Sequence, residues 1–358
     1  MCARSSKTVL EQIAQRLAAA GSLVVVSHDR PDGDALGSMA ALVLCASAAG
    51  KSATAIVPAD APARYAFLLE GAPAAGPERF GELARQADCI VVADTCALAQ
   101  LEGFEDGLRR FREKVVVIDH HLTRDEVGSL EWIDASAAAA GVMVAELIAQ
   151  TGWPLGRAAA AALAAAILTD TGWLRFSNTD ARALQAVAKL TKAGAKLDEL
   201  HTRIYQSDRP ARLLLKARML AGLELHCGGR LAVMTIRKAD FAETGASQAE
   251  TEDLVNEAMS LGFVEAAVLV VEMDGTVRAS LRSKRVSPPD RGAPAAMHRG
   301  EAPLAAGGPP RVADVSRIAA RFGGGGHARA AGCKQQGTAD EFKAAIIEAC
   351  RQELADAE

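Results

Sequence analysis

The chain has 358 residues, half of them apolar, and its 40 basic and 44 acidic side chains give a formal net charge of −4. This length exceeds one typical domain and favours two, and the slightly acidic balance excludes a protein that coats long nucleic acid through a broad basic face. The seven cysteines form no C-x-x-C pair and their number is odd, which argues against a disulfide scaffold or a structural zinc site. The cysteine pattern fits reduced thiols in the cytoplasm better than disulfides or a zinc site. We also expect no signal peptide and no membrane span, because no uncharged apolar run reaches the roughly eighteen residues that a span needs.

Short apolar, β-branched runs alternate with helix-length segments in the first half of the chain. Buried strands separated by helices predict an α/β fold with a parallel sheet. Ligands of such sheets bind beyond the carboxyl ends of the strands, so the residues after each strand are candidates for function. The pattern predicts strands at 23–27, 89–93 and 115–118, and helices at 37–49, 137–150, 157–168 and 178–190.

The second half predicts a smaller α/β unit after a mostly helical connection. Residues 286–310 are rich in Pro, Gly and Ala and predict a flexible insertion. The expected parts are a catalytic, metal-binding domain at 1–195, a helical linker at 196–226 and a substrate-binding domain at 227–358, with the active site in the cleft. Within the last part we predict strands at 231–236, 266–271 and 277–281, a helix at 251–260 and a final helix from about Ala339.

Acidic and imidazole side chains follow three of the predicted strands and one predicted helix. Taken singly, each has an ordinary interpretation: an Asp after a strand is usually a helix N-cap, a lone His is usually structural, and Asp-Gly-Asp occurs in turns and calcium loops. Together, so many carboxylates at one sheet edge would repel one another unless cations neutralised them. Mixed carboxylate and imidazole ligands favour manganese or a similar ion, and their number predicts a pair of ions. The residues are His28, Asp32, Asp34, Asp94, Asp119, His120, His121 and Asp170.

A run of four glycines precedes His327. Glycines let the backbone approach a ligand closely, and their N–H groups can cradle an anion, with a flexible hinge as the alternative. His327 and Arg329 beside this turn are candidates for binding a phosphate.

The motifs in these segments resemble those of the DHH phosphoesterases. His28-x-x-Pro-Asp-x-Asp34-x-x-Gly-Ser, Asp94, Asp119-His-His and Asp170-Thr-Gly resemble the four motifs of that family. The stretch 323–332, GGGGHARAAG, resembles the glycine-rich motif of the DHH-associated C-terminal domain. The most similar group is the stand-alone nano-RNases, oligoribonucleases that also remove phosphate from 3′-phosphoadenosine 5′-phosphate.

The resemblance implies roles for these residues. One manganese would be held by His28, Asp32, Asp94 and Asp170, and the other by Asp34, Asp94, His120 and Asp170. Asp94 would bridge the two ions, Asp119 would orient an imidazole, and His121 would contact the phosphate and assist the leaving oxygen. Substrate contacts are implied at Arg282, Ser283, Gly324, Gly325, Gly326, His327 and Arg329, although an exposed, solubilising role is the alternative for Arg282.

The expected reaction is hydrolysis by metal-activated water, without a covalent enzyme intermediate. The hydroxyls of Ser38 and Thr95 are therefore expected to cap helices. One departure from the family is the segment 138–142, AAAGV, where many relatives carry polar residues whose contacts would be missing here.

Two rival functions stay open. One is a soluble phosphodiesterase for cyclic dinucleotides or their linear products, and the other is a non-catalytic RNA- or nucleotide-binding module. A pyrophosphatase is disfavoured by the glycine-rich motif, and a RecJ-type exonuclease by the short, acidic chain. The expected partners are short single-stranded RNAs or small nucleotides, with no long duplex and no membrane, and a homodimer is compatible with the sequence.

Overall fold

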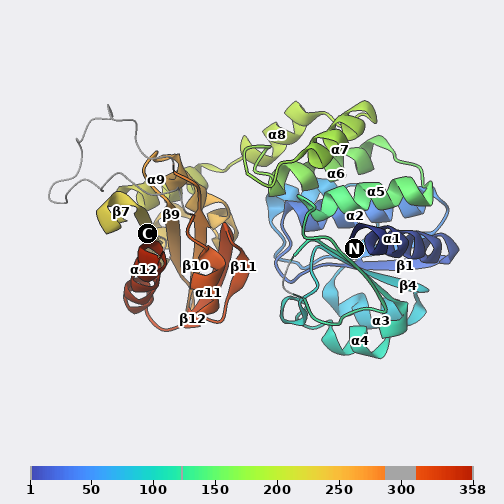
Figure 1. Cartoon of the computed structure of the whole chain (residues 1–358), viewed down its shortest axis with the longest axis horizontal. Helices are drawn as coiled ribbons and strands as arrows, with labels where there is room; N and C mark the ends of the chain where they lie inside the picture. Colours follow the sequence, from blue (N-terminus) through green and yellow to red (C-terminus); the bar gives the residue numbers. More distant parts are fainter. Residues whose placement is uncertain (1, 122–123, 287–311, 357–358) are drawn as a thin grey trace. The chain divides into compact units, whose positions relative to one another are not determined.

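The computed structural model describes residues 2–121, 124–286 and 312–356, and it divides into two compact units, Met1–Ser207 (unit 1) and Asp208–Glu358 (unit 2) (Figure 1). The predicted insertion at 286–310 lies outside the described residues, apart from Val286. The predicted linker is divided between the units. Leu200 packs in the core of unit 1, whereas Leu215 and Met219 pack in a core of unit 2.

Unit 1 is built on a parallel sheet, as predicted. Among the described residues this sheet has six strands in the order β3-β2-β1-β4-β5-β6, and every neighbouring pair is parallel. The elements of unit 1 are α1 (Cys2–Ala19), β1 (Ser22–Val26), α2 (Gly33–Ala48), β2 (Ser52–Ile56), β3 (Ala74–Ala75), α3 (Phe80–Gln86), β4 (Cys89–Ala93), α4 (Glu105–Arg110), β5 (Val115–Asp119), β6 (Leu130–Ile133), α5 (Ala140–Thr151), α6 (Arg157–Asp170), α7 (Ala181–Lys192) and α8 (Leu197–Tyr205).

Helices cover both faces of this sheet. Val25 and Val91 pack into a core with α1, α2, α5 and α6, whereas Val24 and Val92 pack into a second core with α3 and α4 (Figure 1). Because side chains alternate between the faces of a strand, a central strand with both faces covered needs a continuous apolar run. This requirement explains the Val- and Ile-rich sequences of β1, β4 and β5.

Helices α2 and α6 approach each other closely because small residues line their contact. A Cβ atom at Gly37 would lie 2.4 Å from the carbonyl oxygen of Ala162, and one at Gly33 would lie 2.5 Å from Oγ1 of Thr169. Glycine is therefore required at both positions for this packing. The close contact brings the last turn of α6 beside the first turn of α2.

Unit 2 is a smaller α/β unit, also as predicted. In the part that the structure describes, its sheet has the order β11-β12-β10-β9-β8-β7, with β8 and β9 parallel and the other pairs antiparallel. One core lies against α11 and α12 and the other against α9. The elements of unit 2 are α9 (Pro210–Ala221), β7 (Glu224–His226), β8 (Leu231–Ile236), α10 (Lys238–Thr244), β9 (Ala266–Glu272), β10 (Thr276–Ser283), α11 (Val315–Ala320), β11 (Gly325–His327), β12 (Ala330–Gln336) and α12 (Ala339–Asp356).

Four predicted helices differ from those in the structure, and one of them is α2, which begins at Gly33 and not at the predicted Gly37. The helix predicted at 251–260 is wrong: two 3₁₀ helices, Gln248–Thr251 and Leu254–Ser260, are separated by Asp253 in a left-handed conformation with φ of 63°. Helix α7 begins later than predicted because the Asp180 side chain caps it by accepting the N–H of Ala183. Helix α5 also begins later, at Ala140, and Ala139 before it is extended.

None of the described helices is both long and apolar enough to cross a membrane. The six cysteines whose side chains the structure describes carry free thiols.

Candidate metal centre

The loop after β1 and the first turn of α2 carry three of the predicted ligands, His28, Asp32 and Asp34. Asp32 caps α2, because its Oδ1 accepts the N–H groups of Asp34 (2.9 Å) and Ala35 (3.1 Å). Asp34 lies in the first turn of α2 and is 1% exposed. The cap therefore fixes the relative positions of two carboxylates at the carboxyl end of β1.

Asp94 follows β4 and lies between two imidazoles. Its Oδ2 is 3.6 Å from Nε2 of His28, and its Oδ1 is 3.4 Å from Nε2 of His120. Asp94 is buried and adopts a left-handed backbone conformation with φ of 63°, which is uncommon for a residue with a side chain. Its Oδ1 has no hydrogen-bond partner among the described residues. Because buried carboxylate oxygens normally have a partner, this oxygen suits a cation.

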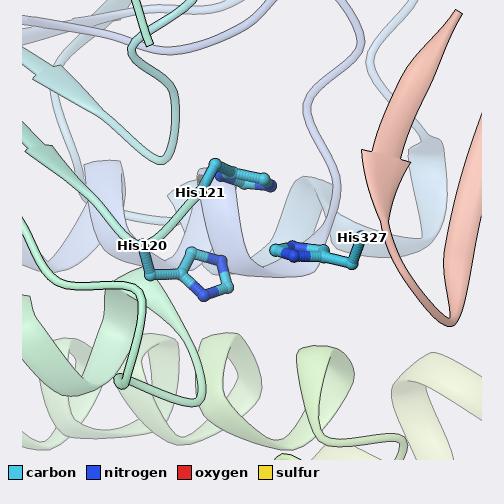
Figure 2. Close-up of side chains that lie close together, drawn as sticks. All are labelled: His120, His121 and His327. Carbon is cyan, nitrogen blue, oxygen red and sulfur yellow. The ribbon is translucent and has the colours of Figure 1, made fainter. Parts of the chain in front are cut away.

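The triplet after β5 holds its two imidazoles in fixed orientations. Asp119 is fully buried, and its Oδ1 accepts the N–H of His120 (2.8 Å) and hydrogen bonds with Nδ1 of His121 (2.6 Å). Nδ1 of His120 lies 3.2 Å from the carbonyl oxygen of Ala137, which can only accept, so this nitrogen carries the proton. Nε2 of His120 is thus left as a lone-pair ligand facing the carboxylates. The two rings lie edge to face with centroids 4.6 Å apart (Figure 2).

Asp170 is the last residue of α6. Its Oδ2 lies 3.9 Å from Nε2 of His120, and its side chain is 27% exposed. The amide of Asn178 donates to the carbonyl oxygens of Asp170 (3.1 Å) and Ala138 (3.0 Å). This helix end therefore reaches the same place as the three strand ends.

The structure thus gathers the six predicted metal ligands and the two predicted catalytic residues, Asp119 and His121, in one cluster of unit 1. Ligand atoms within each of three groups lie within 4.8 Å of one another. The groups are His28, Asp32 and Asp94; Asp34, His120 and Asp170; and Asp94, Asp119 and His121.

The electrostatics of this cluster favour added positive charge. Burial, followed by the charges of Asp94 and Asp170, raises the pKa of Asp34 well above its usual value, and burial raises the pKa of Asp170 to about 6. Burial alone would lower the pKa of His120, but the carboxylates of Asp94, Asp170 and Asp34 raise it well above its usual value. Two unit charges about 4 Å apart interact by about 4 kcal/mol at an effective dielectric constant of about 20.

Asp94 differs from the other carboxylates. Burial alone would raise its pKa, but the imidazoles of His120 and His28 lower it. Asp94 therefore stays ionised, whereas the raised pKa values of Asp34 and Asp170 favour the protonated forms of those two side chains. Three features fit a divalent cation site: Oδ1 of Asp94 has no hydrogen-bond partner among the described residues, the raised pKa values show that added positive charge is favourable, and the donors are carboxylates and imidazoles.

Neither Ser38 nor Thr95 caps a helix as predicted, and the N-cap residue of the 3₁₀ helix after Thr95 is Ala97, without a side-chain cap. Ser38 does not cap a helix: it lies inside α2, and its hydroxyl is 3.4 Å from Oδ1 of Asp34. Oγ1 of Thr95 accepts the N–H of Ala97, just before a short 3₁₀ helix at Leu98–Gln100.

The predicted substrate-binding residues of unit 2 lie on the last residues of β10, on β11 and its approach, and in the turn between β11 and β12. Arg282 pairs with Ala330, and Ala330 pairs with His327 across the hairpin of β11 and β12. Arg329 lies in the turn of this hairpin. The hydroxyl of Ser283 donates to the carbonyl of Ala313 at 2.7 Å, which leaves it only a lone pair for other contacts.

The glycine run forms the edge strand β11 and its approach, which explains the need for glycine. A Cβ atom at Gly324 would lie 2.1 Å from the carbonyl oxygen of Gly332, and one at Gly326, where φ is 134°, would lie 2.5 Å from that of Ala330. The glycine run is therefore packed against β12, and this packing argues against the flexible hinge that was the alternative.

Two contributors to the site were not predicted. Asn178 has no sequence signal, since it lies eight residues after Asp170 in a loop. The backbone N–H groups of Ala140 and Gly141 bind Asp34. The only hint was the unusual AAAGV sequence at 138–142.

Comparison with known proteins agrees with the fold and the motifs. Residues 22–167 match the family model described as the DHH family, N-terminal domain. The bifunctional oligoribonuclease and PAP phosphatase NrnA of Thermus thermophilus is 30% identical over 339 residues, which cover 93% of this chain and 90% of that protein. The protein of the same name from Bacillus subtilis is 27% identical over 291 residues, covering 80% and 88%.

Solved structures also share the fold. An exopolyphosphatase-related protein from Bacteroides fragilis superposes with a TM-score of 0.84 at 21% identity and covers 98% of both chains. RecJ from Thermus thermophilus in complex with Mn2+ superposes with a TM-score of 0.53 at 16% identity, covering 96% of this chain and 55% of that one.

The parallel sheet with an acidic and imidazole cluster at its carboxyl edge defines the class of protein, an α/β hydrolytic enzyme that acts on phosphate esters. The chain belongs to the DHH family.

Proposed function

We propose that this chain hydrolyses phosphate esters in very short RNA oligonucleotides and in 3′-phosphoadenosine 5′-phosphate, using water activated by two manganese ions. Both named relatives are oligoribonucleases and PAP phosphatases by name and align with most of the chain. The observation that carries the two-ion proposal is the position of Asp94, whose two oxygens face His28 and His120 separately. A carboxylate in this position is suited to bridge two ions.

The ligand sets follow from the groups in the cluster. One ion would be held by the group of His28, Asp32 and Asp94, and the other by the group of Asp34, His120 and Asp170, with Asp94 shared between the two. Bound there, a pair of divalent ions supplies a hydroxide nucleophile at neutral pH and offsets the charge of the phosphate.

His121 is suited to act on the leaving oxygen. Burial alone would lower its pKa, but the carboxylates of Asp119 and Asp94 raise it, so the protonated ring persists nearer to neutral pH. The 2.6 Å contact with Asp119 holds Nδ1 in place. A protonated ring in this orientation can donate through Nε2 to the phosphate or to the departing oxygen.

We propose that unit 2 selects the substrate. Arg282, His327 and Arg329 lie around the β11–β12 hairpin, and arginine binds phosphate through two parallel hydrogen bonds. A few such contacts, in a chain whose net charge is −4, suit a short anionic substrate better than a long one.

The test is a substrate panel for the purified full chain with manganese. It contains labelled RNAs of graded length, 3′-phosphoadenosine 5′-phosphate, and cyclic and linear dinucleotides, and the Asp94→Ala variant serves as the control for contaminating nucleases. We expect the highest kcat/KM for the shortest RNAs and clear release of phosphate from the mononucleotide. A preference for cyclic dinucleotides would favour the phosphodiesterase alternative. Binding without any hydrolysis would favour a non-catalytic module.

A further inference from the structure

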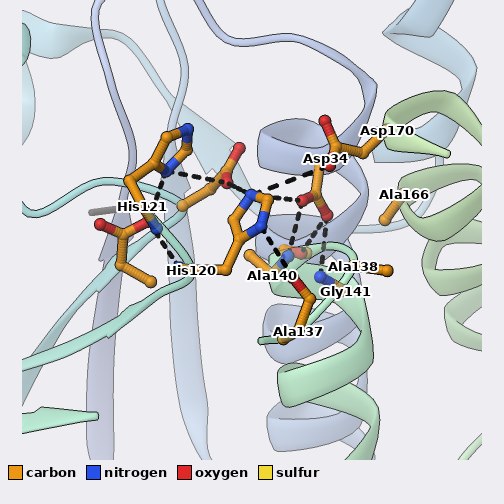
Figure 3. Close-up of polar contacts among 12 residues, drawn as sticks. Asp34, His120, His121, Ala137, Ala138, Ala140, Gly141, Ala166 and Asp170 are labelled. Atoms are coloured by element: carbon orange, nitrogen blue, oxygen red, sulfur yellow. Dashed lines mark hydrogen bonds and ion pairs between the residues drawn. The ribbon is translucent and has the colours of Figure 1, made fainter. Parts of the chain in front are cut away.

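One short segment of unit 1 contacts two members of a single ligand group, Asp34 and His120, and is linked to the third, Asp170, through Asn178. Residues 137–141 lead through a bend and the extended residue Ala139 into the first turn of α5, and they are buried. Their side chains are methyl groups or a hydrogen atom, so every polar contact of the segment comes from its backbone. Figure 3 shows the contacts of this segment with Asp34 and His120.

The contact with Asp34 is made by two N–H groups at the beginning of α5. Ala140 N donates to Oδ2 of Asp34 at 2.6 Å, and Gly141 N donates to Oδ1 at 2.8 Å (Figure 3). These N–H groups have no partner within their own helix, and the helix dipole favours an anion at this end. Each carboxylate oxygen has two acceptor positions, so Asp34 keeps a lone pair for a cation.

The other two contacts use carbonyl oxygens just before the helix. The carbonyl of Ala137 accepts from Nδ1 of His120 at 3.2 Å, which directs the lone pair of Nε2 towards the carboxylates. The carbonyl of Ala138 accepts at 3.0 Å from the amide of Asn178, which also donates to the backbone of Asp170 at 3.1 Å.

We propose that residues 137–141, together with Asn178, position the ligands of one of the two ions, the ion held by Asp34, His120 and Asp170. In the described structure, the side chains that hydrogen bond with residues 137–141 are those of Asp34, His120 and Asn178, so the group of His28, Asp32 and Asp94 is held by other contacts. This inference rests on the proposed two-ion site. It also explains how the chain functions with alanines where many relatives have polar residues, because backbone groups orient the ligands.

Gly141 is the position where this role can be tested. A Cβ atom there would lie 2.7 Å from Cβ of Ala166 and 3.2 Å from Oδ1 of Asp34. The Gly141→Ala substitution would therefore push the N–H donor and the carboxylate apart. Gly107→Ala is a matched control, since a Cβ atom there meets Cε1 of Phe80 at the same 2.7 Å, in the core on the other face of the sheet.

The experiment measures manganese binding by calorimetry and by EPR spectroscopy on the metal-free full chain. We expect the wild type and Gly107→Ala to bind two ions that give the spectrum of an exchange-coupled pair. Gly141→Ala should bind one ion with nearly unchanged affinity and the second at least about tenfold more weakly, with the spectrum of an isolated ion. Two ions bound by Gly141→Ala with wild-type affinities and the coupled spectrum would overturn the inference.

A second variant covers the case in which Gly141→Ala fails to fold. Asn178 is exposed, so Asn178→Ala should fold, and Asn256→Ala is its control because Asn256 donates to Asp253 in unit 2. We expect Asn178→Ala to weaken the binding of one manganese ion and Asn256→Ala to leave the binding of both ions unchanged. Unchanged binding of both ions by Asn178→Ala would count against the inference. If the wild type binds fewer than two ions, the proposed two-ion site itself fails, which is a distinguishable result.

Discussion

Nδ1 of His121 lies 2.6 Å from Oδ1 of Asp119, a carboxylate that is fully buried. The same oxygen also accepts backbone N–H groups, so a single buried atom orients both the imidazole and the chain that carries it. Replacing Asp119 by Asn keeps the shape but removes the charge that supports a protonated His121. We expect kcat to fall about 10- to 100-fold, with bound manganese unchanged when measured by elemental analysis. Parallel loss of metal would show that Asp119 is itself a ligand.

The bridging role of Asp94 predicts a larger effect. Asp94→Ala should abolish hydrolysis while the fold is kept, because it removes a ligand from both ions and leaves His28 and His120 without their shared partner. Activity is measured as single-turnover hydrolysis of a dinucleotide, and folding by circular dichroism. A folded variant that keeps more than about a tenth of the rate would contradict a bridging role, given the several kcal/mol that such metals supply.

Arg282 should affect substrate binding and leave the metal site unchanged. Arg282→Ala removes a guanidinium from the end of β10 beside the β11–β12 hairpin, so we expect KM for a dinucleotide to rise about tenfold or more with an unchanged manganese content. Arg351→Ala is the matched control, because this exposed arginine on α12 pairs with Glu348. An Arg282→Ala variant with wild-type KM would remove this residue from the proposed substrate site.

The raised pKa of Asp170 predicts how the metal-free protein responds to pH. Burial raises this pKa from 3.8 to about 6, so between these values the folded chain binds more protons than the unfolded chain. The contribution of Asp170 to stability therefore decreases as pH rises through this window. Metal-free Asp170→Asn should be more stable than the metal-free wild type at pH 7, by on the order of 1–2 kcal/mol, and the difference should vanish below pH 4.

Urea unfolding at several pH values measures this difference. Adding manganese should reverse the order, because the wild type gains a cation beside Asp170 and the variant loses a ligand. A metal-free variant that is less stable than the wild type at pH 7 would mean that the Asp170 carboxylate is stabilised by the fold in its charged form.

Much of the site could be predicted from local sequence. Asp119, His120 and His121 are adjacent in the chain and follow an apolar run, and the carboxyl ends of parallel strands meet at one sheet edge whatever the rest of the fold does. The strand at 89–93 was predicted with its observed bounds for the same reason, since a fully buried strand must be continuously apolar. Weaker strands such as Ser52–Ile56 were not predicted, because SATAI has too few large apolar residues to be distinctive.

The sequence by itself determined the parallel α/β architecture and the set of side chains that meet at the sheet edge, because strand composition and chain-local order carry that information. Only the tertiary structure decided how these side chains are held. The N–H of Gly141 reaches Asp34 across 107 residues, and Asn178 joins Ala138 to Asp170. Backbone donors and acceptors are the same in every residue, so their partners depend on how the helices pack and leave no trace in the amino-acid pattern.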